Sequence, residues 1–354
     1  DHGESLGQHG IYFSHHGIYD DVLRVPLVVW SSDMAGPDGA EHGAGQRVTR
    51  TVTTADIANT LLGYTGIVSF AHTMFFGIGA YGVAIALTRL GPGWDAVAVG
   101  VLAGLAMALV LAVLIGLFSL RVRTIFFAMI TLAVASAFLI LASQLSDLTG
   151  GEDGLNYRLP IGLRPSFSLA DGALFGVRLN GRLLDYYLVY FVSLTLVLVL
   201  LRIVNSPFGS VLMAIRENPF RAEAIGYRTV VYRTAASCIA AIVASLAGAL
   251  LALWSSQTNP DTTLSFEIMV DLLLIVVIGG MGTMYGAVIG AVLLVLAQNY
   301  LQELLGLANK ALTGVPLLAS LFHPDRWLLW LGLAFILCVY FFPTGIVGKL
   351  RQRR

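Results

Sequence analysis

The sequence predicts an all-α polytopic membrane protein. Of its 354 residues, 57% are hydrophobic and only 12% are charged, and the mean hydropathy is +0.80. A soluble domain is about 45–50% apolar and about 25% charged, so this composition excludes a large soluble enzyme. It also excludes a disordered chain, because disordered segments are poor in apolar residues. The formal net charge is zero, which gives no indication of a nucleic-acid partner.

Long apolar segments predict the membrane spans in chain order. A spanning helix needs about 20 mainly apolar residues. The segments that meet this requirement are residues 67–87, 96–120, 124–145, 186–204, 234–254 and 327–347. The stretch between Asp271 and Glu303 is free of charge, is too long for one span and is rich in glycine. We therefore expect two shorter, glycine-broken helices there, over 266–280 and 283–301.

Basic residues predict the orientation of these spans, because Arg and Lys concentrate in cytoplasmic loops. The loop between the fourth and fifth spans carries Arg202, Arg216, Arg221, Arg228 and Arg233, and residues 349–354 carry four more basic side chains. Both segments are expected inside, so an even number of spans must separate them. Splitting the glycine-rich stretch gives four. The total is eight spans, with residues 1–65 and the C-terminus in the cytoplasm and residues 146–185 outside, where they either contact a partner or cap the bundle.

Two ionisable residues, His72 and Asp271, fall at plausible membrane depth. Such residues are expensive to bury and are candidates for a translocation path, although Asp271 also fits the watery outer end of a helix. The spans show no chain of Asp, Glu and His of the kind that a proton relay needs. This weakens an ion-coupled carrier as an alternative function but leaves it open.

Small residues recur at helical spacings along the predicted spans. Gly100 and Gly104, and likewise Gly286 and Gly290, match the small-xxx-small pattern of closely packed membrane helices. Glycine-broken helices that line a path are the alternative reading. The path residues that we expect near these breaks are Gly66, Ser69, His72, Gly77, Asp271, Gly279, Gly280 and Gly282.

The loop over residues 205–232 predicts two short helices on the cytoplasmic face. Ser206 is placed to cap the first helix, with Pro207 at its first position. Val211, Leu212 and Ile215 then form an apolar stripe. Asn218-Pro219 begins the second helix, and Gly226 ends it. A structured connection of this kind suits a docking surface for a cytoplasmic partner, and an interfacial helix resting on lipid is the alternative.

Six blocks of residues resemble one known family. They are 61–72 (Leu-Leu-Gly-Tyr-Thr-Gly-Ile-Val-Ser-Phe-Ala-His), 75–81 (Phe-Phe-Gly-Ile-Gly-Ala-Tyr), 149–155 (Thr-Gly-Gly-Glu-Asp-Gly-Leu), 214–222 (Ala-Ile-Arg-Glu-Asn-Pro-Phe-Arg-Ala), 277–283 (Val-Ile-Gly-Gly-Met-Gly-Thr) and 343–348 (Pro-Thr-Gly-Ile-Val-Gly). In this order and over residues 61–350, the chain resembles the LivM-like permeases of branched-chain amino-acid ABC importers.

The resemblance implies a permease subunit in a bacterial inner membrane that moves branched-chain or related amino acids by alternating access. Its partners would be a second, related permease, two cytoplasmic ATP-binding subunits and a periplasmic amino-acid-binding protein. The residues that match the family's ATPase-docking segment are Arg216, Glu217, Asn218, Pro219, Arg221, Ala222 and Gly226. ATP would be used by the partners, because the chain has no Gly-x-x-x-x-Gly-Lys-Ser/Thr loop. No cofactor is expected on this chain.

The first sixty residues differ in composition and hold most of the histidines. The segment Asp1-His2-Gly3-Glu4, together with residues 15–17, 19–20, 23–27 and 52–62, resembles the C-terminal part of a sulfatase catalytic domain. In this resemblance, Asp1 and His2 match two metal ligands of that family. The Cys/Ser-x-Pro-x-Arg nucleophile block and the other ligands are absent from this segment, and metal-assisted hydrolysis needs both. We expect a small α/β remnant with at most a residual divalent-metal site. A membrane-anchored hydrolase of sulfate or phosphate esters is the enzyme alternative.

These two resemblances divide the chain into a sulfatase-like fragment, 1–60, and a permease domain, 61–354. The chain starts at Asp1, and LivM-like permeases have further spans before the 63–66 block, so we expect both parts to be truncated. No Pro/Ser/Gly-rich linker separates them. A join of this kind predicts either a fusion gene or two genes spliced by an assembly or gene-finding error.

Overall fold

A computed structural model describes the fold of Tyr64 and of residues 69–119, 124–164, 166–167, 180–280, 284–311, 322–323 and 326–341. The long helices are α3 (His72–Leu90), α4 (Trp94–Ser119), α5 (Thr124–Gln144), α7 (Gly181–Val204), α10 (Thr229–Ser255), α12 (Phe266–Gly279), α13 (Met284–Ala311) and α15 (Trp327–Phe341). The shorter elements are α6 (Ser146–Thr149), β1 (Leu155–Asn156), η2 (Ile161–Leu163), α8 (Pro207–Glu217), α9 (Pro219–Ala224), β2 (Gln257–Thr258) and α11 (Pro260–Thr263). The predicted α/β remnant of residues 1–60 lies outside the described residues.

The described chain is mainly helical and confirms a polytopic membrane protein. Each of the eight predicted spans contains a long helix, but only six helical segments of the described chain are long and apolar enough to cross a membrane. The segments are His72–Leu90, Trp94–Leu117, Phe126–Gln144, Gly181–Val204, Thr229–Ser255 and Pro260–Gly279. The other two predicted spans are shorter within the described residues, where the apolar part of α13 is Gly286–Ala297 and α15 has 15 residues.

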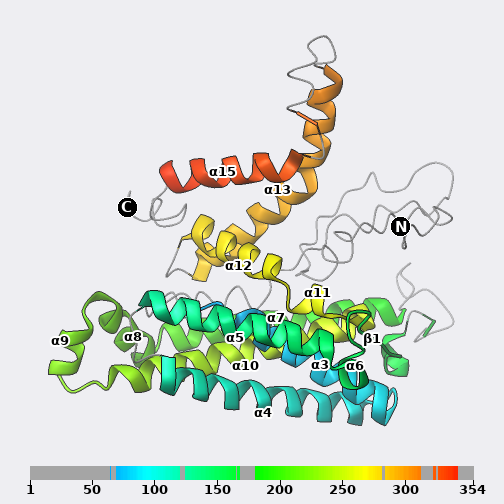
Figure 1. The fold of residues 1–354 in the computed structure, drawn as a ribbon, viewed down its shortest axis with the longest axis horizontal. Helices are drawn as coiled ribbons and strands as arrows, with labels where there is room; N and C mark the ends of the chain where they lie inside the picture. The colour runs from blue at the N-terminus through cyan, green and yellow to red at the C-terminus, as the bar shows by residue number, and fades with distance from the viewer. Residues whose placement is uncertain are drawn as a thin grey trace, which may run out of the picture.

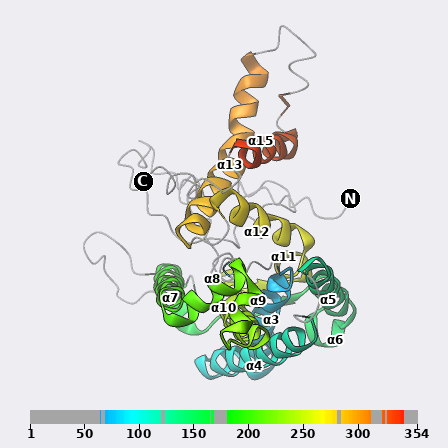
Figure 2. The same cartoon turned by 90° about the vertical axis from the view of Figure 1, so that its left-hand side faces the viewer.

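Helices α3 and α10 form the centre of the bundle, and α4, α5 and α7 surround them (Figure 2). Within the molecule, 67% of the α3 span and 78% of the α10 span are buried, against 22–28% for the spans of α4, α5 and α7. The outer helices are apolar all round, so their exposed sides suit lipid or another subunit rather than water. Helices α13 and α15 stand away from this bundle (Figure 1).

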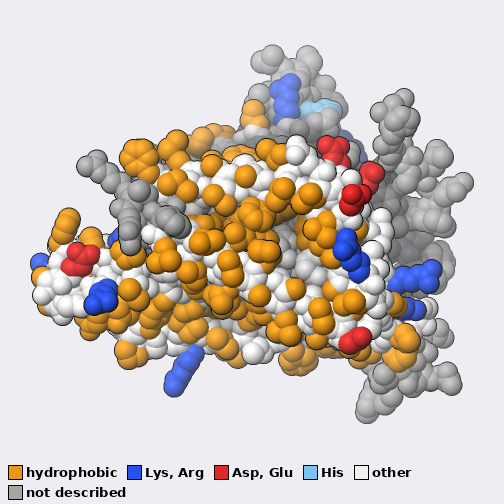
Figure 3. Space-filling model, turned by 60° about the horizontal axis from the view of Figure 1, so that its bottom comes forward, with side chains coloured by type: hydrophobic (Ala, Val, Ile, Leu, Met, Phe, Trp, Pro, Cys, Tyr) orange, Lys and Arg blue, Asp and Glu red, His pale blue; other side chains and the backbone are white. Residues whose placement is uncertain are grey.

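An apolar band covers the middle of the bundle surface, and charged side chains gather at its two ends (Figure 3). Helices α8 and α9 lie at one end, and α6, β1 and α11 lie at the other (Figure 1). Trp94 begins α4 and is half exposed, and Tyr187 in the second turn of α7 is exposed. Exposed aromatic rings at that level match the aromatic belts of membrane proteins.

Backbone-to-backbone contacts bring α3, α4 and α10 together. Gly79 of α3 lies against the Ser245 carbonyl of α10, and Gly248 of α10 lies against the Phe76 carbonyl of α3. Gly104 of α4 approaches Gly79, where a Cβ on Gly104 would lie 3.3 Å from the Gly79 Cα. Only glycine permits helix axes to approach this closely, as in small-xxx-small packing. The predicted packing role of Gly104 is confirmed.

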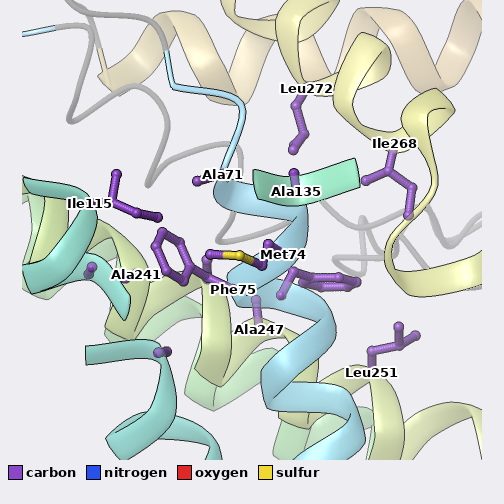
Figure 4. Close-up of a cluster of buried hydrophobic side chains, with 14 of the residues drawn as sticks. Ala71, Met74, Phe75, Ile115, Ala135, Ala241, Ala247, Leu251, Ile268 and Leu272 are labelled. Atoms are coloured by element: carbon purple, nitrogen blue, oxygen red, sulfur yellow. The ribbon is translucent and has the colours of Figure 1, made fainter. Parts of the chain in front are cut away.

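The main apolar cluster surrounds the beginning of α3 (Figure 4). Met74 and Phe75 of α3 are fully buried there, among alanines from α4, α5 and α10. Ile268 and Leu272 of α12 close the cluster from the other side. Helix α12 is thus held against the first turns of α3, which places the two predicted path regions on neighbouring elements.

The segment that joins α5 to α7 folds back onto the bundle. Its strand β1 pairs antiparallel with β2, with Leu155 opposite Thr258. The Tyr157 hydroxyl donates to the Ala252 carbonyl over 2.7 Å and lies 2.9 Å from Thr258 Oγ1. Burial raises the pKa of the Tyr157 hydroxyl above its ordinary value of 10, so the proton needed for this bond is retained. Residues 145–164 therefore cap this end of the bundle.

Candidate functional sites

Helix α8 is anchored to the bundle by the apolar stripe that the sequence predicts. Pro207 occupies its first turn, where the missing N–H is not needed. Leu212 and Ile215 are fully buried, and Leu212 joins the cluster formed with α7 and α10. Ser206 is the N-cap residue, but its hydroxyl donates to the Ile203 carbonyl rather than capping the helix. The expected side-chain cap at Ser206 is therefore wrong, because the hydroxyl is turned back toward the carboxyl end of α7 and accepts from no N–H of α8.

Helix α9 is fixed by its own cap and by a turn. The Asn218 side chain accepts from the Arg221 N–H over 3.0 Å, as a cap residue does. Gly226 has φ of +97°, the left-handed conformation that ends helices and favours glycine. Ala222 is buried, and the Thr229 hydroxyl donates to Glu223. The predicted pair of short helices is confirmed, with a rigid turn after the second.

The remaining side chains of α8 and α9 present a mixed surface at this end of the bundle. Arg216, Glu217, Asn218 and Arg221 are exposed, and Pro219 is half-buried. Phe220 is 82% exposed and Ile225 is 68% exposed, which is unusual for apolar side chains outside the lipid belt. An open hollow of about 380 Å³ adjoins them, lined by Glu223, Gly226, Tyr227, Arg228, Thr229 and Val230. Exposed apolar groups ringed by charges are typical of protein interfaces.

The predicted path residue His72 begins α3 and is fully buried. Its Nδ1 lies 3.1 Å from the carbonyl oxygen of Ser69, another predicted path residue. The Nε2 atom is buried and has no hydrogen-bond partner among the residues that the structure describes. An orphaned buried polar atom costs about 1–3 kcal/mol, so this nitrogen calls for an explanation beyond packing.

The other predicted path residues lie around α3 and α12. Gly77 faces the Leu264 side chain just before α12, so the path prediction there coincides with a close packing contact. Asp271 lies half-buried on α12, one residue before Leu272 of the main cluster. Gly279 ends α12 against the Gly286 carbonyl, and Gly280 has φ of +113°. Gly66 and Gly282 lie outside the described residues.

Two polar residues that the sequence analysis missed are buried at the β1–β2 end. Tyr157 pins the cap to α10, as described above. Asp185 lies on the buried side of α7, and its Oδ1 has no hydrogen-bond partner within the described ranges. Asp185 falls just before the predicted span over 186–204, whereas α7 begins at Gly181.

The described part of the chain contains no group of three or more His, Cys, Asp or Glu side chains that could hold a metal ion. Asp1 and His2, the candidate metal ligands, lie outside it. Cys238 is a free thiol on α10. The described residues thus offer a membrane bundle, a charged surface on α8 and α9, and buried polar atoms around α3 and α7.

Comparison with known proteins identifies the class. A family model described as "Branched-chain amino acid transport system / permease component" matches residues 51–321, and the chain belongs to this family. The match begins ten residues before the expected boundary at 61 and ends before 350. No solved structure shows significant similarity to the chain.

Three relatives carry related names. The chain is 29% identical over 281 residues to the high-affinity branched-chain amino acid transport system permease protein LivM of Salmonella typhimurium, and 28% identical to the protein of that name from Escherichia coli. Each alignment covers 75% of this chain and 65% of the relative. A probable branched-chain amino acid transport permease protein LivM of Methanocaldococcus jannaschii is 26% identical over 46% of each chain. The chain thus spans about 65% of the length of its bacterial relatives.

Proposed function

We propose that this chain is a permease subunit of an ABC importer for branched-chain or related amino acids. The observation that carries the proposal is the family match over residues 51–321, and the exposed charged and apolar side chains of α8 and α9 support it. Transport would proceed by alternating access in a bacterial inner membrane, with α8, α9 and the C-terminus in the cytoplasm. A second, related permease would complete the membrane part, and a periplasmic amino-acid-binding protein would deliver the substrate.

The energy would come from two cytoplasmic ATP-binding subunits that dock on α8 and α9. The proposed contacts are Arg216, Glu217, Asn218, Pro219, Arg221, Ala222 and Gly226. Asn218, Ala222 and Gly226 shape the two helices through the cap, the buried contact and the turn described above. Arg216, Glu217 and Arg221 are exposed and available to a partner. Leu212 packs in one apolar cluster with residues of α7 and α10, so movement of α8 would be transmitted to these membrane helices.

Charge reversal tests this docking. We expect Glu217→Arg or Arg221→Glu to abolish co-purification of the ATPase subunits while membrane insertion of the chain is unchanged. Arg202→Glu, an exposed reversal at the end of α7, is the matched control and should leave co-purification intact. Unchanged co-purification in both docking variants would refute the docking surface.

The substrate path is proposed to run along the seam between α3 and α12. Its candidate residues are Gly66, Ser69, His72, Gly77, Asp271, Gly279, Gly280 and Gly282. The packing of Ile268 and Leu272 on the start of α3 supports one continuous seam. The ion-coupled carrier makes the opposite prediction for energy supply: uptake would persist without the ATPases and collapse with the proton gradient.

The first sixty residues are proposed to add no enzymatic activity. They contain no Cys-x-Pro-x-Arg or Ser-x-Pro-x-Arg block, which a formylglycine-dependent sulfatase requires. The purified chain should therefore not hydrolyse a sulfate ester such as 4-nitrophenyl sulfate when calcium is added. Turnover above that of a His2→Ala, Asp1→Ala double variant would establish the hydrolase instead.

A further inference from the structure

The amino end of α3 lies within the bundle rather than at its edge. The Phe70 N–H just before the helix donates to Thr131 Oγ1 of α5 over 3.1 Å. Thr131 is fully buried and lies seven residues beyond the start of α5, which is about 10 Å along the helix axis. Non-helical backbone at this depth is tolerated only where it is buried in protein or lines a cavity. The non-helical backbone just before α3 is therefore held in place by its contact with α5.

The first turn of α3 carries no negative charge of its own. Its N-cap residue, Ala71, supplies no side-chain cap, and the turn contains no acidic residue. The backbone N–H groups of a helix amino terminus and the helix dipole together attract anions. In discontinuous membrane helices such ends point to the carboxylates of transported molecules.

His72 supplies a second and independent polar group at the same place. Its Nδ1 lies beside the Ser69 carbonyl, which can only accept, so Nδ1 carries the proton in the neutral ring. Nε2 is then a lone-pair acceptor, buried and without a hydrogen-bond partner among the described residues. The ring meets Phe75 edge-on, with centroids 6.4 Å apart, which holds its orientation. This acceptor is matched by a donor such as an ammonium group.

We infer that the start of α3 is the binding site for the backbone of a zwitterionic α-amino acid, with the substrate carboxylate at the α3 amino terminus and its ammonium group on His72 Nε2. The inference rests on the proposed function. The apolar cluster of Met74, Phe75 and Leu272 beside it provides surroundings for a branched aliphatic side chain. His72 is only 1% exposed, so the elements packed around the start of α3 must move to admit substrate.

Equilibrium binding of tritiated leucine to the full chain and its partner permease in nanodiscs tests the site. Two competitors each lack one charged group: leucinamide has no carboxylate, and 4-methylpentanoate has no ammonium group. Leucine should compete at least tenfold better than either. Equal competition by all three would overturn the inference without any substitution.

A pair of variants then isolates His72. Asparagine can keep the bond to Ser69 but has no group at the Nε2 position, whereas glutamine can bring an amide oxygen there. His72→Asn should weaken leucine binding at least tenfold while 4-methylpentanoate binding is unchanged, and His72→Gln should be less affected. The thermal midpoint of each variant checks folding. An unchanged dissociation constant for leucine in folded His72→Asn would refute the site.

Transport by the complete importer distinguishes a failure of the substrate site at α3 from a failure of the proposed function. If the wild-type complex imports leucine but the nanodisc sample binds none, the inference fails and the proposed function stands. If the complex neither imports nor binds a branched-chain amino acid, the proposed function fails as well.

Discussion

Gly82 of α3 and Gly100 of α4 contact each other through their backbones. A Cβ on Gly82 would lie 2.7 Å from the Gly100 carbonyl oxygen, and a Cβ on Gly100 would lie 2.6 Å from the Gly82 carbonyl oxygen. Neither position accepts a side chain, because the nearest neighbour of each is a backbone atom that cannot turn aside. The predicted small-xxx-small packing of Gly100 thus has a specific partner on α3.

We predict that Gly100→Ala lowers the free energy of unfolding by about 1–3 kcal/mol, the usual cost of overpacking a filled core. The reason is that α3 and α4 must separate to admit the methyl group. Thermal unfolding in detergent measures the effect. Gly162→Ala is the control, since a Cβ there meets nothing within 4 Å. Equal midpoints for the two variants would contradict the close helix contact.

The elbow between α12 and α13, where Gly279 lies against Gly286, is likewise predicted to tolerate no added side chain. A Cβ on Gly279 would overlap the Gly286 carbonyl, and a Cβ on Gly290 would lie 2.9 Å from the Gly279 nitrogen. Gly279→Ala should therefore open the elbow and reduce leucine uptake by at least tenfold. Gly332→Ala on α15, where a Cβ meets nothing within 4 Å, serves as the control. Full uptake by Gly279→Ala would show that the elbow has no part in transport.

On α8 and α9, one substitution is predicted to affect folding and another to affect ATPase docking. Leu212 is fully buried, so Leu212→Ala should destabilise the chain by about 2–5 kcal/mol. Phe220 is 82% exposed, so Phe220→Ala should leave the thermal midpoint unchanged and weaken ATPase co-purification at least fivefold. Both quantities can be measured on the same purified samples. If Phe220→Ala retained full ATPase binding, its exposed ring would not belong to the docking surface.

We predict that burial of the Tyr157 hydroxyl makes the folded chain less stable at alkaline pH. Its pKa is raised in the folded chain, so above about pH 10 the unfolded chain loses this proton while the folded chain keeps it. Unfolding is then favoured as the pH rises from 10, and below that value the group makes no pH-dependent contribution. The thermal midpoint of Tyr157→Phe should fall less steeply between pH 9 and 11 than that of the wild type. If the thermal midpoints of Tyr157→Phe and the wild type fell equally steeply with pH, the burial of the hydroxyl would be contradicted.

Much of the fold could be predicted because apolar length determines where membrane helices form. The break between α12 and α13 followed from glycines, and the two short helices at 207–224 followed from Pro207, Asn218 and Gly226. Asp185 was missed because the predicted span begins at residue 186, although helix α7 begins at Gly181. The β1–β2 pairing spans two residues a strand, which is too short to give a periodic signal.

The candidate site could be predicted only in part. His72 stood out as an ionisable residue in an apolar span, but its tie to Ser69 and the Phe70–Thr131 bond depend on tertiary structure. Sequence spacing gives no sign that residue 131 lies beside residue 70. The orphaned Nε2 atom, which carries the substrate inference, became visible only with the packing around it.

The central claim is that the chain is a permease driven by separate ATPases. Its most direct test is uptake of radiolabelled leucine by proteoliposomes that contain the full chain, the second permease, the ATPase subunits and the binding protein of the same organism. The account predicts leucine uptake that requires ATP and is abolished by Glu217→Arg together with Arg221→Glu. Uptake that persists without ATP, or is unchanged by this double charge reversal, would contradict it.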